Sequence, residues 1–324
     1  MTSPAIAVLG ERIVDLVPGD DPAAYRAVAG GSPANVALGV QRLGAAAVLL
    51  GRSADDGLAE LLDRAITDNG LSTAGILRRS GASLLAVCTR NADGSVHYAF
   101  YYESAPDLRW NAADLGEALA AARSAGARAW HTGSLVSWLG TGVGDLLAAW
   151  QAAAGQGDLT LSYDPNARPG TIPREEMRER VEAFVAAADV VKVSDEDLNY
   201  LYPDRTPEEM CARWMEAGPG LVVLTRGPNG VAAWRHGHDV IEVSGRPVTV
   251  ADTVGAGDTI SAALLVGLGD AGVLGGDLST LTDDQVREIL ERAVVAAAIT
   301  CSREGAQPPT RAEVDAGLSL PTAL

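Results

Sequence analysis

Short apolar runs alternate along this chain with longer segments in which apolar residues recur at helical spacing. The apolar runs predict β-strands at 5–9, 46–50, 129–131, 159–163, 190–193 and 221–225. The helical spacing predicts helices at 57–69, 144–154, 174–187, 258–268 and 283–301, and one that begins after Ser194. Strands that alternate with helices in this way indicate an α/β fold, with a parallel sheet covered by helices on both faces.

The segment from Ser32 to Gly44 carries signals for both ends of a helix. Ser32 has the residue type of an N-cap, Pro33 suits the first helical position, and Gly44 is typical of the residue that follows a helix. We therefore expect a helix over this segment, with Ser32 as its N-cap.

One stretch breaks the alternation of strands and helices. Two strand-like segments, 84–89 and 96–102, are joined by Asn91-Ala92-Asp93-Gly94, which is typical of a hairpin turn. The second segment carries an aromatic cluster of Tyr98, Phe100, Tyr101 and Tyr102. These features predict a small antiparallel sheet inserted in a single domain that spans residues 1–324, and this sheet would cover a pocket as a lid or form a subunit interface.

Charge and cysteine content exclude several classes of partner. The chain has 324 residues and a formal net charge of -17, which repels nucleic acids and anionic membranes. The three cysteines (Cys88, Cys211 and Cys301) lie far apart and form no CxxC pair, so we expect neither a disulfide framework nor a structural zinc site. Because no apolar run has the length of a membrane span and the N-terminus has no signal-peptide pattern, we expect a cytoplasmic protein.

Several common enzyme motifs are absent from the sequence. The single lysine, Lys192, precedes Val193 rather than Ser or Thr, which excludes a Walker A phosphate-binding loop. None of the four histidines belongs to an HRD or HExxH motif, and the chain has no GxSxG. Protein kinases of the usual type, zincins and common α/β-hydrolases are therefore excluded.

The segment Asp252-Thr-Val-Gly-Ala-Gly-Asp258 runs into the apolar helix predicted at 258–268. Small residues at the start of a helix (Gly255, Ala256 and Gly257) expose backbone N–H groups, and the helix dipole adds to their attraction for a phosphate. A carboxylate at this place, that of Asp258, can accept a proton from an attacking hydroxyl. The alternative is that Asp258 only caps the helix.

A second cluster lies near the N-terminus. Gly30 and Gly31 precede the predicted helix, and its first turn presents Asn35, whose amide can both donate to and accept from a sugar hydroxyl. Asp15 follows the first strand, at the edge where parallel sheets bind their ligands. The alternatives are an ordinary tight turn for the glycines and a solvated loop carboxylate for Asp15.

Together these segments resemble the two signatures of the PfkB, or ribokinase-like, carbohydrate kinases. The first signature is matched by Gly30-Gly31-Ser-Pro-Ala-Asn35 and the second by Asp252-Thr-Val-Gly-Ala-Gly-Asp258. Three further blocks resemble the family in the expected order, so the resemblance covers nearly the whole chain. These blocks are Asp164-Pro-Asn-Ala-Arg168-Pro, Lys192-Val-Ser-Asp-Glu-Asp197 and Thr225-Arg-Gly227-Pro-Asn-Gly230.

The resemblance implies a ribokinase-like fold, with a lid formed by about 11–29 and 74–109, and ATP-dependent phosphorylation of a sugar. It implies that Asp258 is the catalytic base and that Gly255, Ala256 and Gly257 form the anion hole. The sugar would be held by Asp15, Gly30, Gly31, Asn35 and, as a candidate, Arg168. The nucleotide would be held by Lys192, Thr225, Gly227, Gly230 and Gly257.

The resemblance also implies Mg²⁺ and suggests K⁺. Asp252 resembles a position used for a monovalent cation, and the segment 298–305 resembles one used for the adenine pocket. Where the family commonly has Asn and then, three positions on, Glu, this chain has Ser194 and Asp197. Asp197 retains a carboxylate that would order magnesium-bound water, but with a shorter side chain.

Within the family the blocks are most similar to those of fructokinases, with 2-keto-3-deoxygluconate kinases close behind. Glu103 follows the aromatic strand, where a carboxylate-binding relative often has Arg, and its charge favours a neutral sugar. Arg168 could instead meet a carboxylate, and the aromatic lid would suit a nucleoside such as adenosine. A sugar-binding regulator without activity is the non-enzyme alternative, and a homodimer through the lid sheet is expected.

Overall fold

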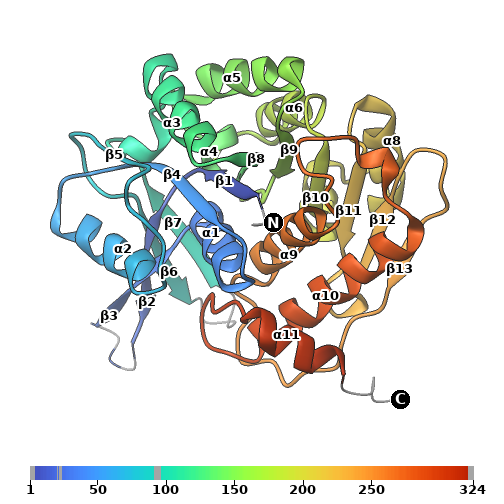
Figure 1. The fold of residues 1–324 in the computed structure, drawn as a ribbon. Helices are drawn as coiled ribbons and strands as arrows, with labels where there is room; N and C mark the ends of the chain where they lie inside the picture. Colours follow the sequence, from blue (N-terminus) through green and yellow to red (C-terminus); the bar gives the residue numbers. More distant parts are fainter. Residues whose placement is uncertain (1–3, 20, 22–23, 91–95, 320–324) are drawn as a thin grey trace.

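A large twisted sheet of nine strands forms the centre of the molecule (Figure 1). The computed structural model describes residues 4–19, 21, 24–90 and 96–319. The strand order is β13-β12-β11-β10-β9-β8-β1-β4-β5. From β5 to β11 all neighbours pair in parallel, while β12 and β13 add an antiparallel edge. In chain order the strands are β1 (Ala5–Leu9), β4 (Ala47–Ser53), β5 (Ile76–Arg78), β8 (Ala127–Gly133), β9 (Thr160–Asp164), β10 (Val190–Ser194), β11 (Leu221–Thr225), β12 (Val231–Trp234) and β13 (Ile241–Val243).

Helices cover both faces of this sheet, as the sequence predicts (Figure 1). One face is covered by α3 (Ala112–Ser124), α4 (Leu135–Trp138), α5 (Val143–Gln156), α6 (Arg174–Val185), α7 (Asp195–Leu201) and α8 (Pro207–Ala217). The other is covered by α1 (Ser32–Arg42), α9 (Ala256–Asp270), α10 (Asp283–Cys301) and α11 (Arg311–Leu318), while α2 (Gly57–Thr67) lies beside the smaller sheet. Short 3₁₀ turns occur at Pro106–Leu108, Gly227–Asn229 and Leu278–Thr280.

Strand β1 shows why the central strands read as continuous apolar runs. Ala7 and Leu9 contribute to the core on one side of the sheet, while Ile6 and Val8 contribute to the core on the other. Because successive side chains of a strand point to opposite faces, a strand covered on both faces must be apolar throughout.

A second, four-stranded sheet lies at one side of the molecule (Figure 1). Its order is β3 (Tyr25–Gly30), β2 (Ile13–Pro18), β6 (Leu85–Arg90) and β7 (Val96–Tyr101). Two antiparallel hairpins are joined by a parallel pairing of β2 with β6. The predicted strand pair is therefore present, and the predicted turn Asn91–Gly94 lies outside the described residues.

Buried charged residues hold the connection between β1 and β2, where the chain enters the smaller sheet, against the rest of the protein. Glu11 is almost fully buried between β1 and β2, and its Oε2 accepts a hydrogen bond from the backbone N–H of Val136 at 3.2 Å. Arg12, also buried, donates from its backbone to Asp107 at 3.2 Å and from its guanidinium to Asp63 at 2.7 Å. Burial raises the pKa of Glu11 and of Asp107 to about 7. The chain therefore leaves β1 through a tightly held connection rather than a free linker.

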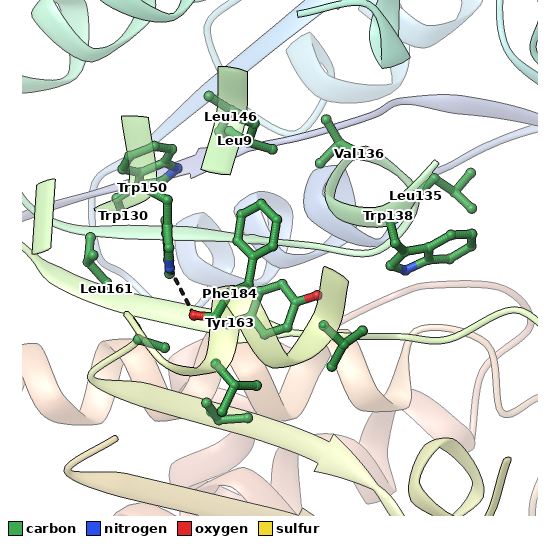
Figure 2. Packing of buried hydrophobic residues seen from close by; sticks show 14 of the residues in the cluster. Leu9, Trp130, Leu135, Val136, Trp138, Leu146, Trp150, Leu161, Tyr163 and Phe184 are labelled. Atoms are coloured by element: carbon green, nitrogen blue, oxygen red, sulfur yellow. Dashed lines mark hydrogen bonds between the residues drawn. The ribbon is translucent and has the colours of Figure 1, made fainter. Parts of the chain in front are cut away.

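Aromatic side chains fill the core beneath α5 and α6 (Figure 2). The rings of Trp130 and Trp150 meet edge to face with centroids 4.9 Å apart, and Tyr163 stacks on Phe184 at 5.2 Å. The indole N–H of Trp150 donates to the backbone oxygen of Phe184 at 3.1 Å. This contact satisfies the one polar group of a fully buried side chain.

Helices α3, α4, α8 and α11 lie where the hydrophobic pattern predicts none. Helix α3 buries only two large apolar residues, Leu115 and Leu119, and alanine occupies both its buried and its exposed positions, so the sequence shows no clear apolar stripe. Helix α8 begins with a complete capping box between Thr206 and Glu209, and these two residue types at this spacing are visible in the sequence.

Replacing Trp150 with alanine tests the packing of this core. We expect the free energy of unfolding to fall by about 3–5 kcal/mol, because the change leaves a large cavity. Urea denaturation measures it. The control, Gln151→Ala on the exposed face of the same helix, should change stability by less than about 0.5 kcal/mol. A loss similar to the control would contradict the packing described here.

Candidate active site

The carboxylate of Asp258 lies at the place where the first turns of α1 and α9 meet. Its Oδ1 accepts a hydrogen bond from the Ser32 hydroxyl at 2.6 Å, and its Oδ2 accepts one from the Asn35 amide at 2.8 Å. The N-cap of α9 is Gly255, with φ of 78°, so the alternative that Asp258 only caps this helix is wrong. The two sequence signatures are thus in direct contact in the structure.

Ser32 does not act as the predicted N-cap of α1. The N-cap is Gly31, and Ser32 is the first helical residue, with its hydroxyl turned to Asp258. At Gly31 φ is 107°, and a Cβ there would lie 2.6 Å from the backbone oxygen of Glu11. Only glycine fits this position, because a side chain would meet backbone as well as an unfavourable φ. The predicted end of the helix is confirmed, since Gly44 follows it with φ of 89°.

Gly30 and Arg168, two of the predicted sugar-binding residues, lie near Asp15 on β2. A Cβ on Gly30 would lie 2.3 Å from Oδ2 of Asp15, so the glycine leaves room for this carboxylate. Burial raises the pKa of Asp15 to about 6, and the positive charge of Arg168 opposes the rise. Arg168 is itself exposed and donates to the backbone oxygen of Ala167 at 3.0 Å.

A buried ion pair lies under the start of α9. The ammonium of Lys192 on β10 donates to Oδ2 of Asp164, at the end of β9, at 2.9 Å. A Cβ on Gly257 would lie only 2.8 Å from the Lys192 Nζ, so the lysine reaches the first turn of the helix. Asp164 belongs to a block that the sequence singled out, but its role as the partner of the only lysine was not predicted.

Electrostatic coupling joins this pair to Asp258. Burial raises the pKa of Asp258, and the negative charge of Asp164 raises it further. The positive charge of Lys192 and the two hydrogen bonds described above act in the opposite direction. The pKa of Asp258 is thus set by a balance between burial and Asp164, which raise it, and Lys192 with the two hydrogen bonds, which lower it.

Asp197 is engaged in local structure. It forms a capping box with Ser194 at the start of α7, as the position of Ser194 predicts, with Oδ2 accepting from the serine hydroxyl at 2.7 Å. Its Oδ1 accepts from the backbone N–H of Ala167 at 2.9 Å. Burial raises the pKa of Asp197, and nearby Asp164 raises it further.

The predicted nucleotide-binding turn follows β11, the neighbour of β10. The hydroxyl of Thr225 donates to the backbone oxygen of Val193 at 3.5 Å. Gly227 has φ of 51° and Gly230 has φ of 89°, and a Cβ on Gly230 would lie 2.1 Å from the backbone oxygen of Val243. Gly227 is therefore favoured by its positive φ alone, and Gly230 by both its φ and the close approach of the backbone.

Asp252 connects the start of the second signature to the predicted segment 298–305. Its Oδ2 accepts from the backbone N–H of Gly305 at 2.9 Å, and its Oδ1 accepts from that of Val254 at 3.1 Å. Close packing continues at Gly255, where a Cβ would lie 2.7 Å from the Cβ of Ala306.

One face of the smaller sheet lies toward this region. Phe100 and Tyr98 stack with centroids 6.5 Å apart, and strand pairing places Ala86 beside both Phe100 and Asp15. The nearby charges of Asp15 and Asp252 contribute, after burial, to raising the pKa of Tyr98 to about 12. Glu103 is exposed, and its backbone oxygen accepts a hydrogen bond from Arg109, a basic residue that the sequence reasoning missed.

The described part of the chain contains no cluster of three or more His, Cys, Asp or Glu side chains arranged to hold a metal ion. Within the same part, none of the helices combines the length and the apolar composition needed to span a bilayer.

Removing Lys192 tests the buried pair. We expect Lys192→Met to lower the free energy of unfolding by about 3–5 kcal/mol, because it leaves the Asp164 charge buried without its partner. The double variant with Asp164→Asn should be more stable than the sum of the single losses by at least about 0.5 kcal/mol. Urea denaturation of all four proteins measures this, with Arg292→Met at an exposed ion pair as a control. Additive losses would contradict the coupling.

Comparisons with known proteins show the family to which the chain is similar. The model of the "pfkB family carbohydrate kinase" matches residues 4–313. The chain is 33% identical to "Probable fructokinase-4" of Arabidopsis thaliana over 326 residues, which cover 95% of each protein. It is also 33% identical to "Fructokinase-1" of Zea mays, over 95% of this chain and 96% of that protein.

The fold is also similar to that of a solved structure. The crystal structure of a fructokinase with bound ATP from Xylella fastidiosa superposes with a TM-score of 0.85 at 26% identity, over 97% of this chain and 98% of the other. The family match and the sequence identity both extend over nearly all of the chain. The protein therefore belongs to the PfkB family of carbohydrate kinases.

Proposed function

We propose that this protein transfers the γ-phosphoryl group of ATP to a hydroxyl of a neutral sugar, with fructose as the preferred acceptor. The observation that carries the proposal is the buried Asp258 carboxylate at the start of α9, beside small residues and Lys192. The fructokinase relatives from two plants and the ATP-bound relative support both substrates.

In the proposed reaction Asp258 removes the proton from the attacking sugar hydroxyl. The sugar oxygen forms a bond to the γ-phosphorus while the bond to the β-phosphate oxygen breaks, and ADP leaves. The proton passes to the Asp258 carboxylate, which can accept it only when it is ionised. Its raised pKa makes it a stronger base than an exposed aspartate.

The start of α9 would stabilise the transferred phosphoryl group. Gly255, Ala256 and Gly257 keep side chains away from the first turn, whose N–H groups lie at the positive end of the helix dipole. The backbone N–H of Ala256 already donates to Thr253 at 3.3 Å, so we assign the larger share to the amides of Gly257 and Asp258. Lys192 adds a positive charge next to Gly257.

We assign the sugar to the region between Asp15 and Asn35. Asp15, Asn35 and the backbone of Gly30 and Gly31 offer acceptors and donors for hydroxyl groups. Negative charge at Asp15 and at exposed Glu103 favours a neutral acceptor over an acidic one. Arg168 and Arg109 are the residues that would favour a 2-keto-3-deoxygluconate-like acid, and stacked Tyr98 and Phe100 would favour a nucleoside.

The nucleotide would lie across the turn formed by Thr225, Gly227 and Gly230. The positive charge of Lys192 does not balance the three carboxylates around it, those of Asp164, Asp197 and Asp258. Such an excess of negative charge would suit Mg²⁺ held through water and phosphate oxygens. Bound Mg²⁺ would neutralise phosphate charge, and Asp197 is our candidate for ordering its water. Asp252, a hard oxygen ligand next to the 298–305 segment, is our candidate for K⁺.

We propose that the smaller sheet, about 11–29 and 74–109, closes over the sugar and excludes water that would otherwise hydrolyse ATP. Its other face carries Tyr25 and Tyr101, which are 46% and 57% exposed. A homodimer through this face would cover them. We place the protein in the cytoplasm, since Cys88, Cys211 and Cys301 are free thiols.

A substrate panel tests the acceptor. ATP consumption is measured with fructose, ribose, 2-keto-3-deoxygluconate, adenosine and inosine in the presence of Mg²⁺ and K⁺. We expect the highest kcat/KM with fructose. Preference for the keto acid would assign its carboxylate to Arg168, and preference for a nucleoside would assign recognition to the aromatic lid. Either result would overturn the choice of sugar.

Asp258→Asn tests the catalytic base. We expect kcat to fall by about three orders of magnitude or more, with sugar affinity retained, because the amide cannot accept the proton. Steady-state kinetics and calorimetric binding measure the two effects. Asp270→Asn, at the exposed end of the same helix, should leave kcat unchanged. Unchanged turnover in Asp258→Asn would refute the assignment, and a wild-type protein that binds sugar without turnover would indicate the regulator.

A further inference from the structure

Ser32 has a contact that neither the sequence pattern nor the family resemblance explains. It stands where an N-cap is expected, but its hydroxyl lies 2.6 Å from Oδ1 of Asp258, 226 positions away in the chain. An ionised carboxylate can only accept hydrogen bonds, so the serine is the donor. A distance of 2.6 Å is in the range of charge-assisted bonds between a hydroxyl and a carboxylate.

We propose that Ser32 is a positioning residue for the proposed catalytic base: its hydroxyl orients the Asp258 carboxylate and stabilises the charged form that accepts the sugar proton. This inference rests on the proposed function. It assigns Ser32 no contact with the sugar or the phosphate.

The backbone around Ser32 fixes where its hydroxyl points. Gly31 before it occupies a conformation in which a Cβ would meet the Glu11 backbone. Pro33 after it has its own φ fixed by the proline ring. Serine has a single side-chain dihedral between Cα and the hydroxyl oxygen, so little entropy is lost when the bond forms.

The two helices that carry the pair are packed closely against each other. A Cβ on Gly39 of α1 would lie 2.7 Å from the Cβ of Ala262 on α9. This close approach fixes the position of the first turn of α1 relative to the first turn of α9. The serine hydroxyl and the carboxylate are thus positioned by the rigid part of the protein rather than by the smaller sheet.

The two donors to Asp258 divide its oxygens. Asn35 donates to Oδ2 and Ser32 to Oδ1, and each oxygen keeps a second lone pair. A sugar hydroxyl can therefore approach without displacing Ser32. Because burial raises the pKa of Asp258 and the Ser32 bond opposes the rise, loss of this bond leaves the carboxylate protonated at a higher pH.

The pH dependence of kcat/KM for the sugar tests this role, since its acid limb reports the base in the free enzyme. In Ser32→Ala we expect the limb to move to higher pH by about one unit, the size of one lost hydrogen bond to a charged group. Activity should recover at higher pH, which a displaced or partly unfolded site would not do. Ser32→Thr keeps the hydroxyl and should restore the wild-type limb.

A matched control removes a hydroxyl from another helix start. Thr282 caps α10, where its neighbours Leu281 and Asp283 contact Arg235 rather than Asp258. Thr282→Ala should lower stability without moving the limb. An unmoved limb in Ser32→Ala, or a Ser32→Thr enzyme that behaves as Ser32→Ala does, would overturn the inference. If Asp258→Asn keeps normal turnover, the proposed function fails instead, so the two failures are distinguishable.

Discussion

A buried carboxylate must be matched by donors, and the site depends on how this chain supplies them to Asp258. Ser32 and Asn35, at the start of α1, donate to it, and Lys192 on β10 acts on it through its positive charge alone. A carboxylate buried without such partners would take up a proton and lose its use as a base. The two glycine-rich turns before α1 and α9 allow these helix starts to meet.

The charges beneath α9 are unequal in number. Lys192 is the only lysine of the chain, and it pairs with Asp164 while Asp197 and Asp258 lie within its field. The lysine ammonium fits beneath Gly257, where the planar guanidinium of an arginine would require more space. This arrangement leaves an excess of negative charge beneath the first turn of α9.

Much of the fold was predictable because its signals are local. Strand β1 is apolar at every position, since helices cover both faces of the sheet, and Ser194 precedes α7 with a complete capping box. Helix α3 escaped prediction because alanine side chains mark no clear stripe. Ser32 was misassigned because an N-cap and a donor to a distant carboxylate have the same residue type.

The sequence by itself determined the alternation of strands and helices, the two glycine-rich turns and, through the family signatures, the candidate residues on each of them. These features depend on neighbours within a few positions. Only the tertiary structure decided that Ser32 and Asn35 hold Asp258, and that Lys192 is paired with Asp164. The packing of α1 against α9 sets the two contacts to Asp258, and the pairing of β9 with β10 sets the contact of Lys192 with Asp164. Each contact joins segments that are separate in the chain, so no local pattern encodes it.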